Sequence, residues 1–133
     1  MSRCFIISLM VVLSSFTGCL SEGTDDIFYG EDIDPPIVVD EFVLENEKGE
    51  YVAMSDYEGK VVVVAFLFTR CPDICPVVSA NLAFIAEELR ERDVNGVQIL
   101  TVTVDPWTDN SSVLDNYATT RQLNWPHLTG SLE

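Results

Sequence analysis

The sequence predicts a domain of the α/β class that is built around one strand–helix–strand unit. Residues 60–68 open with Lys60 and continue as an uninterrupted apolar run with four valines, which is typical of a strand buried on both faces in the middle of a parallel sheet. After Pro76 the apolar residues recur at steps of four, three and four, namely Val78, Leu82, Ile85 and Leu89. That spacing is the apolar stripe of a helix, which we expect to end near Arg92. A second run, rich in valine and threonine, spans residues 97–104 and should pair with the first in parallel through a right-handed crossover.

A β-hairpin is expected ahead of this unit. Phe42 and Leu44 alternate with polar residues, which is typical of a strand with one buried face. Residues 46–49 (Asn-Glu-Lys-Gly) give a turn signal, and residues 51–53 form the returning strand. A short turn at residues 55–59 then leads into the apolar run.

A second helix is expected after the strand at residues 97–104. Ser112 and the acidic residue three positions later, Asp115, resemble a capping box and should open a helix that runs to about Arg121. Residues 110–112 (Asn-Ser-Ser) also form a glycosylation sequon, but capping is the simpler use of these side chains. A loop should begin at residues 124–126 (Asn-Trp-Pro).

Length and charge restrict the possible functions. At 133 residues the chain holds one domain at most. Its formal net charge of −15 excludes nucleic acid as a partner, because phosphate binding needs a basic patch. The acidity is typical of a solvated surface. The more specific alternative is that it attracts a cationic partner or a metal ion.

The amino-terminal residues 1–19 resemble a lipoprotein-type signal peptide. An apolar segment at residues 5–16, too short to span a bilayer, ends in Phe-Thr-Gly before Cys19. An ordinary signal peptide and an uncleaved anchor are the alternatives. We expect a lipid on Cys19, an acidic tether at residues 20–37 and a domain at residues 38–133, held at the outer face of the cytoplasmic membrane.

Cys71 and Cys75 are the thiols that this organisation leaves for chemistry, since Cys4 is discarded with the leader and Cys19 is lipidated. Proline favours the first helical position, so we place Pro76 there, Cys75 at the N-cap and Cys71 in the preceding turn. The partial positive charge of a helix start should lower the pKa of a thiol. Two such sulfurs can form a disulfide or share one soft metal ion such as Cu(I). The alternative is that Cys71 and Cys75 form a disulfide with a structural role only.

Three blocks of sequence, in one order and spacing, carry a family resemblance. They are Lys-Val-Val-Val-Val-Ala-Phe at 60–66 with Thr-Arg-Cys-Pro-Asp-Ile-Cys-Pro at 69–76, then Thr-Val-Asp-Pro at 103–106 with Asp109, then Trp125 with Leu-Thr-Gly at 128–130. Together they resemble the Sco/SenC family, the membrane-tethered copper proteins of cytochrome c oxidase assembly. The resemblance covers roughly residues 42–131.

The resemblance implies a thioredoxin-like fold with a βαβ core and an N-terminal β-hairpin. A further hairpin and a last helix would follow Gly130, so the fold is expected to be incomplete at the C-terminus. The family binds copper, Cu(I) and also Cu(II), through two cysteines and a histidine. Cys71 and Cys75 match the cysteines, and the histidine is expected beyond residue 133. His127 falls where the family has no ligand, and we expect a surface or loop residue. The implied partner is the copper-bearing subunit of cytochrome c oxidase.

Four charged residues near the cysteines are further candidates for a role at the thiol site. Arg70 adjoins Cys71 and would favour its thiolate. Asp73 would either bond to amides of the loop or oppose thiolate formation by its charge. Asp105 and Asp109 are expected to be turn and cap residues rather than metal ligands, because carboxylates suit harder cations.

Three functions remain open at this point. The first is a copper chaperone, and the second is a thiol–disulfide oxidoreductase that reduces the cysteines of an extracytoplasmic client. The third is a peroxide-reducing enzyme, for which only Arg70 is an obvious activating donor. The Cys-x-x-Cys spacing of ordinary thioredoxin-like reductants is absent, which counts against the second as the sole function. Copper binding is therefore favoured over catalysis.

Overall fold

The computed structural model describes residues 30, 31 and 33–130. Val38 opens a compact unit that contains every helix and strand of the described residues. The leader expected at residues 1–19, the lipid site at Cys19 and residues 20–29 of the expected tether lie outside the described residues. Within the described part, no helix combines the length and the apolar character that crossing a bilayer requires.

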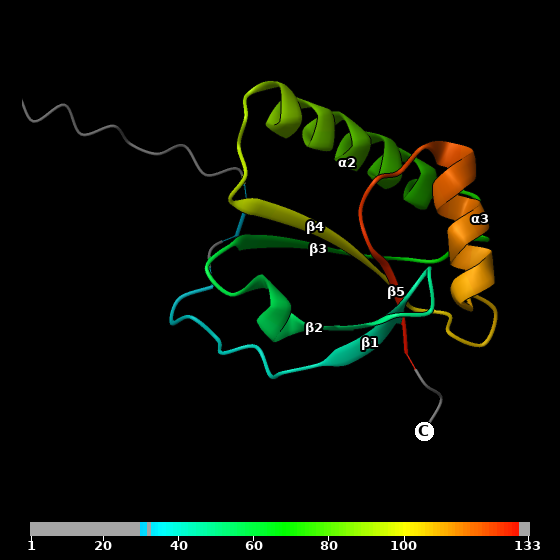
Figure 1. The fold of residues 1–133 in the computed structure, drawn as a ribbon, viewed down its shortest axis with the longest axis horizontal. Coiled ribbons are helices and arrows are strands. Elements are labelled where there is room, and N and C mark those ends of the chain that lie inside the picture. The colour runs from blue at the N-terminus through cyan, green and yellow to red at the C-terminus, as the bar shows by residue number, and fades with distance from the viewer. Residues whose placement is uncertain (1–29, 32, 131–133) are drawn as a thin grey trace, which may run out of the picture. The chain divides into compact units, whose positions relative to one another are not determined.

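A five-stranded mixed sheet forms the centre of the unit within residues 33–130 (Figure 1). Its strands are β1 (Val43–Asn46), β2 (Tyr51–Ala53), β3 (Val61–Leu67), β4 (Val97–Thr103) and β5 (His127–Thr129), in the spatial order β2-β1-β5-β4-β3. Strand β4 pairs in parallel with both β3 and β5, whereas β1 pairs antiparallel with β2 and β5. The predicted hairpin and the predicted parallel βαβ core are therefore both confirmed.

Two α-helices, α2 (Ile74–Glu91) and α3 (Ser111–Arg121), pack against one face of this sheet. Leu82 of α2 and Tyr117 of α3 belong to one core cluster that also contains Ile99 of β4. The next residue along β4, Leu100, belongs to a second cluster on the opposite face, because successive side chains of a strand alternate between faces. The short 3₁₀ helix η2 (Met54–Tyr57) contributes Tyr57 to that second cluster.

The turn between β1 and β2 follows from its residues. The Asn46 side-chain oxygen accepts hydrogen bonds from the backbone N–H groups of Lys48 and Glu50, each at 2.9 Å. Gly49 has a φ of +79°, in the left-handed region that glycine adopts without steric cost. These two features close the hairpin and fix the register of β1 on β2.

Among the described residues, strand β3 lies at the edge of the sheet and pairs with β4 alone, whereas a place in the middle was predicted. Val61, Val64 and Phe66 are 64%, 39% and 68% exposed. Its pairing with β4 over seven residue positions is nevertheless continuous. An apolar run indicates a strand, but it carries no information on how many neighbours that strand has.

The segment after α3 also differs from the prediction. A loop was expected from residue 124 onward, whereas β5 is inserted between β1 and β4 at His127–Thr129. A strand of three residues is too short to show a periodic pattern. The N-cap of α3 is Asn110 rather than Ser112, and its side chain accepts the Val113 N–H at 3.1 Å. Asparagine and serine cap equally well, so the choice depends on where the backbone turns.

Candidate metal centre

Cys71 and Cys75 lie in the segment that joins the carboxyl end of β3 to α2. The α2 helix begins at Ile74 with Asp73 at the N-cap, so Cys75 and Pro76 are its second and third residues. The predicted start, with Pro76 first and Cys75 at the cap, is wrong by two residues. Proline is tolerated throughout the first turn, because the N–H groups there have no acceptor within the helix.

The Cys71 sulfur occupies the place of a capping side chain at this helix start. The side chain of Asp73 makes no cap hydrogen bond, whereas the Cys75 backbone N–H donates to Cys71 Sγ at 3.4 Å. Both thiols are free; Cys71 is half-buried and Cys75 is buried. The hydrogen bond places one sulfur directly against the turn that carries the other cysteine.

The two thiols differ in their tendency to ionise. The side-chain hydrogen bond from Cys75 is the main cause that lowers the pKa of Cys71, and the backbone N–H groups of Asp73, Cys75 and Ile74 act in the same direction. Burial raises the pKa of Cys75, and donating a hydrogen bond to Cys71 raises it further. Cys71 is therefore the thiol that ionises first, with Cys75 as its hydrogen-bond donor.

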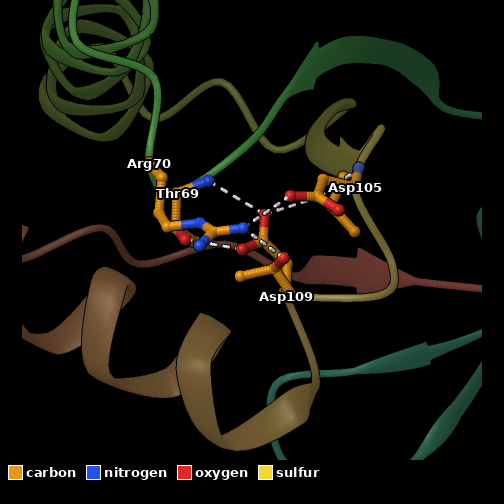
Figure 2. A network of polar contacts seen from close by, with 6 residues as sticks. Thr69, Arg70, Asp105 and Asp109 are labelled. Carbon is orange, nitrogen blue, oxygen red and sulfur yellow. Dashed lines mark hydrogen bonds and ion pairs between the residues drawn. The ribbon is translucent and has the colours of Figure 1, made fainter.

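The loop after β4 holds the residues that precede Cys71 (Figure 2). Asp109 has no exposed surface, and its carboxylate accepts three hydrogen bonds. They come from the Thr69 N–H at 2.9 Å, the Thr69 hydroxyl at 2.5 Å and the Thr103 hydroxyl at 2.7 Å. Asp109 was expected to be a turn or cap residue, and this buried role was missed. The available signal was that parallel strands β3 and β4 end at the same edge of the sheet, close to both threonines.

Arg70 reaches the same loop from the solvent side. Its Nη2 donates to Thr108 Oγ1 at 2.5 Å and lies 3.4 Å from the Asp105 carboxylate. Because the Arg70 side chain is 69% exposed, this ion pair contributes little stability. The groups that lower the pKa of Cys71 belong to the helix start, and Arg70 is not among them. Asp105 is a turn residue as predicted, since its carbonyl accepts the N–H groups of Thr108 and Asp109.

His127 is buried in β5, so the prediction of a surface or loop histidine is wrong. Its ring lies beside those of Trp125 and Tyr117, at centroid distances of 5.7 and 6.1 Å. Among the described residues, neither ring nitrogen has a hydrogen-bond partner. Burial lowers the pKa of His127, and the charge of Glu47 opposes that shift.

The described residues bring two soft ligands together without a third. No group of three or more His, Cys, Asp or Glu side chains in this part of the chain could hold a metal ion. A pair of thiols at one helix start, Cys71 just before the helix and Cys75 in its first turn, suits a soft ion such as Cu(I) in ligand type and leaves a coordination position for another donor. A cavity of about 780 Å³ beside Glu47, Tyr57 and Trp125 is not lined by either cysteine.

Comparison with known proteins finds a matching family model, related sequences and similar solved structures. The SCO1/SenC family model matches residues 30–133. The chain is 31% identical over 106 residues to the SCO1 protein homolog of Bacillus subtilis, covering 76% of this chain and 54% of that protein. The structure of BsSco, a member of the Sco family of cytochrome c oxidase assembly proteins with a disulfide switch, aligns with a TM-score of 0.64 at 30% identity, over 70% of this chain and 55% of that chain. Copper-bound yeast Sco1 aligns with a TM-score of 0.66 at 30% identity, over 72% of this chain and 53% of that chain.

These matches agree with the fold described above. The chain spans about half the length of these relatives. The thioredoxin-like α/β fold expected from the sequence is confirmed. With its family model covering residues 30–133, the chain belongs to the SCO1/SenC family.

Proposed function

We propose that this chain supplies the dithiol part of a Sco protein that binds copper for the assembly of cytochrome c oxidase. The observation that carries the proposal is the helix start, where Cys71 Sγ accepts the Cys75 N–H at 3.4 Å and two free thiols share one turn. Membership of the SCO1/SenC family and the likeness to copper-bound yeast Sco1 support copper as the ligand.

Cys71 and Cys75 would hold the copper through their sulfur atoms. Thiolates are soft ligands and favour Cu(I), and Cu(II) is the second oxidation state proposed for the same site. Metal binding requires deprotonated sulfur, so the lowered pKa of Cys71 makes it the first ligand. A histidine beyond residue 133 is the third donor of this proposal. The copper is cargo for the copper-bearing subunit of the oxidase.

The second candidate function uses the same thiols without metal. In that reaction Cys71 and Cys75 become one disulfide and lose two protons and two electrons, which a client disulfide takes up to become two thiols. The unequal pKa values favour this chemistry, because Cys71 can attack as thiolate while Cys75 stays protonated until the mixed disulfide is resolved. The disulfide switch of BsSco supports it.

A Cu(I) competition titration with a chromophoric chelator tests the metal proposal. Cys71→Ser and Cys75→Ser should each weaken Cu(I) binding by at least about 10–100-fold, since each removes one of two sulfur ligands. In the unprocessed chain, Cys4→Ser is the matched control, because it removes a thiol outside the proposed site, and it should bind as the parent chain does. Equal retention by all variants would place the copper elsewhere. No retention by the parent, together with a reversible Cys71–Cys75 disulfide, would leave only the metal-free function.

We also propose that Cys19 is lipidated and that residues 20–37 tether the domain to the outer face of the cytoplasmic membrane. The support is the Phe-Thr-Gly-Cys sequence after a short apolar segment. Two acyl chains hold a protein stably, whereas one holds it weakly. Membrane fractionation of Cys19→Ser should recover the protein in the soluble fraction. Full retention in the membrane would identify the leader as an uncleaved anchor.

A further inference from the structure

We propose that Asp109 is a positioning residue that holds Thr69 and thereby fixes residues 68–73, the segment between β3 and α2 that is called the Cys71 loop below. The inference rests on the function proposed above and extends it from the two sulfurs to a neighbouring loop. That loop, residues 105–109, is called the β4–α3 loop below. It joins β4 to α3 and lies beside the carboxyl end of β3 (Figure 2).

The carboxylate of Asp109 is suited to this task by its hydrogen-bonding capacity. Burying a carboxylate is unfavourable unless donors surround it, and Asp109 has no exposed surface. Oδ2 accepts from the Thr69 N–H and the Thr103 hydroxyl, and Oδ1 accepts from the Thr69 hydroxyl. A carboxylate accepts from all three groups at once, and hydrogen bonds to a charged acceptor are about twice as strong as neutral ones. An amide in the same place could accept from the Thr69 N–H, but its NH₂ would force the Thr69 hydroxyl to turn and accept, which leaves a weaker, neutral contact. The site therefore favours a carboxylate.

The contacts of Asp109 continue to the cysteine along a short stretch of chain. Thr69 precedes Cys71 by two residues and is held through both its backbone and its side chain. Arg70, between them, is bonded to Thr108 of the β4–α3 loop at 2.5 Å. The Cys71 N–H donates to the Phe68 carbonyl at 3.3 Å, and Cys71 Sγ meets the first turn of α2. The Cys71 loop is therefore held at one end by the β4–α3 loop and at the other by the first turn of α2.

A loop held at both ends keeps the two sulfurs near each other. Two groups at a fixed separation react as though at a high effective concentration, and less freedom is lost when they join. Loosening Thr69 should then weaken the Cys71–Cys75 disulfide and the Cu(I) chelate together. A carboxylate that served only the stability of the domain would leave the thiol equilibrium unchanged.

The test is the thiol–disulfide equilibrium of the full chain in glutathione buffers. All proteins carry Cys4→Ser and Cys19→Ser, so that one pair reacts: two protein thiols and one oxidised glutathione give one protein disulfide and two reduced glutathiones. Asp109→Asn should lower the equilibrium constant about tenfold, which makes the reduction potential about 30 mV less negative. Asp115→Asn makes the same change at an exposed position of α3 and should match the parent.

A second pair of variants keeps the test decisive if Asp109→Asn does not fold. Thr69→Val retains the shape but lacks the hydroxyl that donates to Asp109, and should shift the equilibrium in the same direction. Thr69→Ser retains a hydroxyl and should restore the parent value. Far-UV circular dichroism reports which variants fold. An unchanged equilibrium constant in folded Asp109→Asn, or in Thr69→Val where the former is unfolded, overturns the inference.

Failure of the proposed function gives a different pattern. The parent would then neither retain Cu(I) against the chelator nor form the Cys71–Cys75 disulfide at any glutathione ratio, which overturns both proposals. Failure of the positioning role alone leaves the parent competent in at least one of these assays, with Asp109→Asn and Thr69→Val indistinguishable from it.

Discussion

Replacing the buried His127 by leucine should be tolerated at neutral pH and should stabilise the domain in mild acid. Neither ring nitrogen has a partner among the described residues, and a buried polar group without a partner costs about 1–3 kcal/mol. Leucine has a similar volume and no polar atom, so it removes that cost while it still packs against Trp125 and Tyr117. At pH 7.5 we expect a free energy of unfolding equal to that of the parent or up to about 1 kcal/mol higher.

The pH dependence follows from the sign of the pKa shift. Burial lowers the pKa of His127, so the folded state binds a proton more weakly than the unfolded chain, in which the ordinary pKa is about 6.5. The stability that depends on His127 is therefore complete above that pH and is lost as the pH falls below it. If the folded imidazole stays neutral, the loss between pH 7.5 and 5.5 approaches about 1.4 kcal/mol. His127→Leu should not show this loss.

Urea unfolding of both proteins at about pH 7.5, 6.5 and 5.5 provides the measurement, within the window in which the ordinary imidazole titrates. Taking the difference between the two proteins cancels the contribution of the 22 Asp and Glu residues that they share. His127→Gln separates loss of the titratable group from loss of polarity. Destabilisation of His127→Leu by more than about 2 kcal/mol at pH 7.5 would mean that the imidazole is hydrogen-bonded after all. A difference that does not vary with pH would refute the titration argument.

Three further outcomes can be checked. Brief treatment with iodoacetamide at neutral pH should label Cys71 before Cys75, because hydrogen bonds lower the pKa of Cys71 while burial raises that of Cys75; peptide mass spectrometry would reveal the opposite order if the assignment were wrong. Asn110→Ala should cost about 1 kcal/mol in urea unfolding, since it removes the N-cap of α3, whereas Asn116→Ala at an exposed position of the same helix should cost less. Leu100→Ala should cost about 3 kcal/mol, because this leucine is fully buried in β4; a loss below about 1 kcal/mol would contradict its place in the core.

The local elements of the fold could be predicted because their signals are local. The apolar run of β3, the stripe of α2 and the β1–β2 turn each depend on residues within a few positions of one another. The neighbours of each strand could not be predicted in the same way. The place of β3 at the edge of the described strands and the insertion of β5 between β1 and β4 depend on pairings with residues far along the chain.

The same distinction separates the parts of the candidate site. Cys71 and Cys75 could be found from their spacing beside Pro76, although the helix start was misplaced by two residues. The roles of Asp109 and His127 could not be found, because both depend on burial by segments that are distant in sequence. An aspartate in a turn and a histidine near a proline have the same local sequence whether exposed or buried.

The hydrogen bonds between Thr69 and Asp109 also bear on how the molecule folds. They join residues separated by 40 positions, so they form only after β3, α2 and β4 have come together. Closing so long a segment is slow relative to forming a helix or a hairpin. The ordered surroundings of Cys71 therefore assemble after local elements such as α2 and the β1–β2 hairpin have formed. Before that step the thiols belong to an open chain that oxidants and the thiols of other proteins can reach. The timing of oxidation relative to β3–β4 pairing then decides whether Cys71 and Cys75 pair with each other or with another protein.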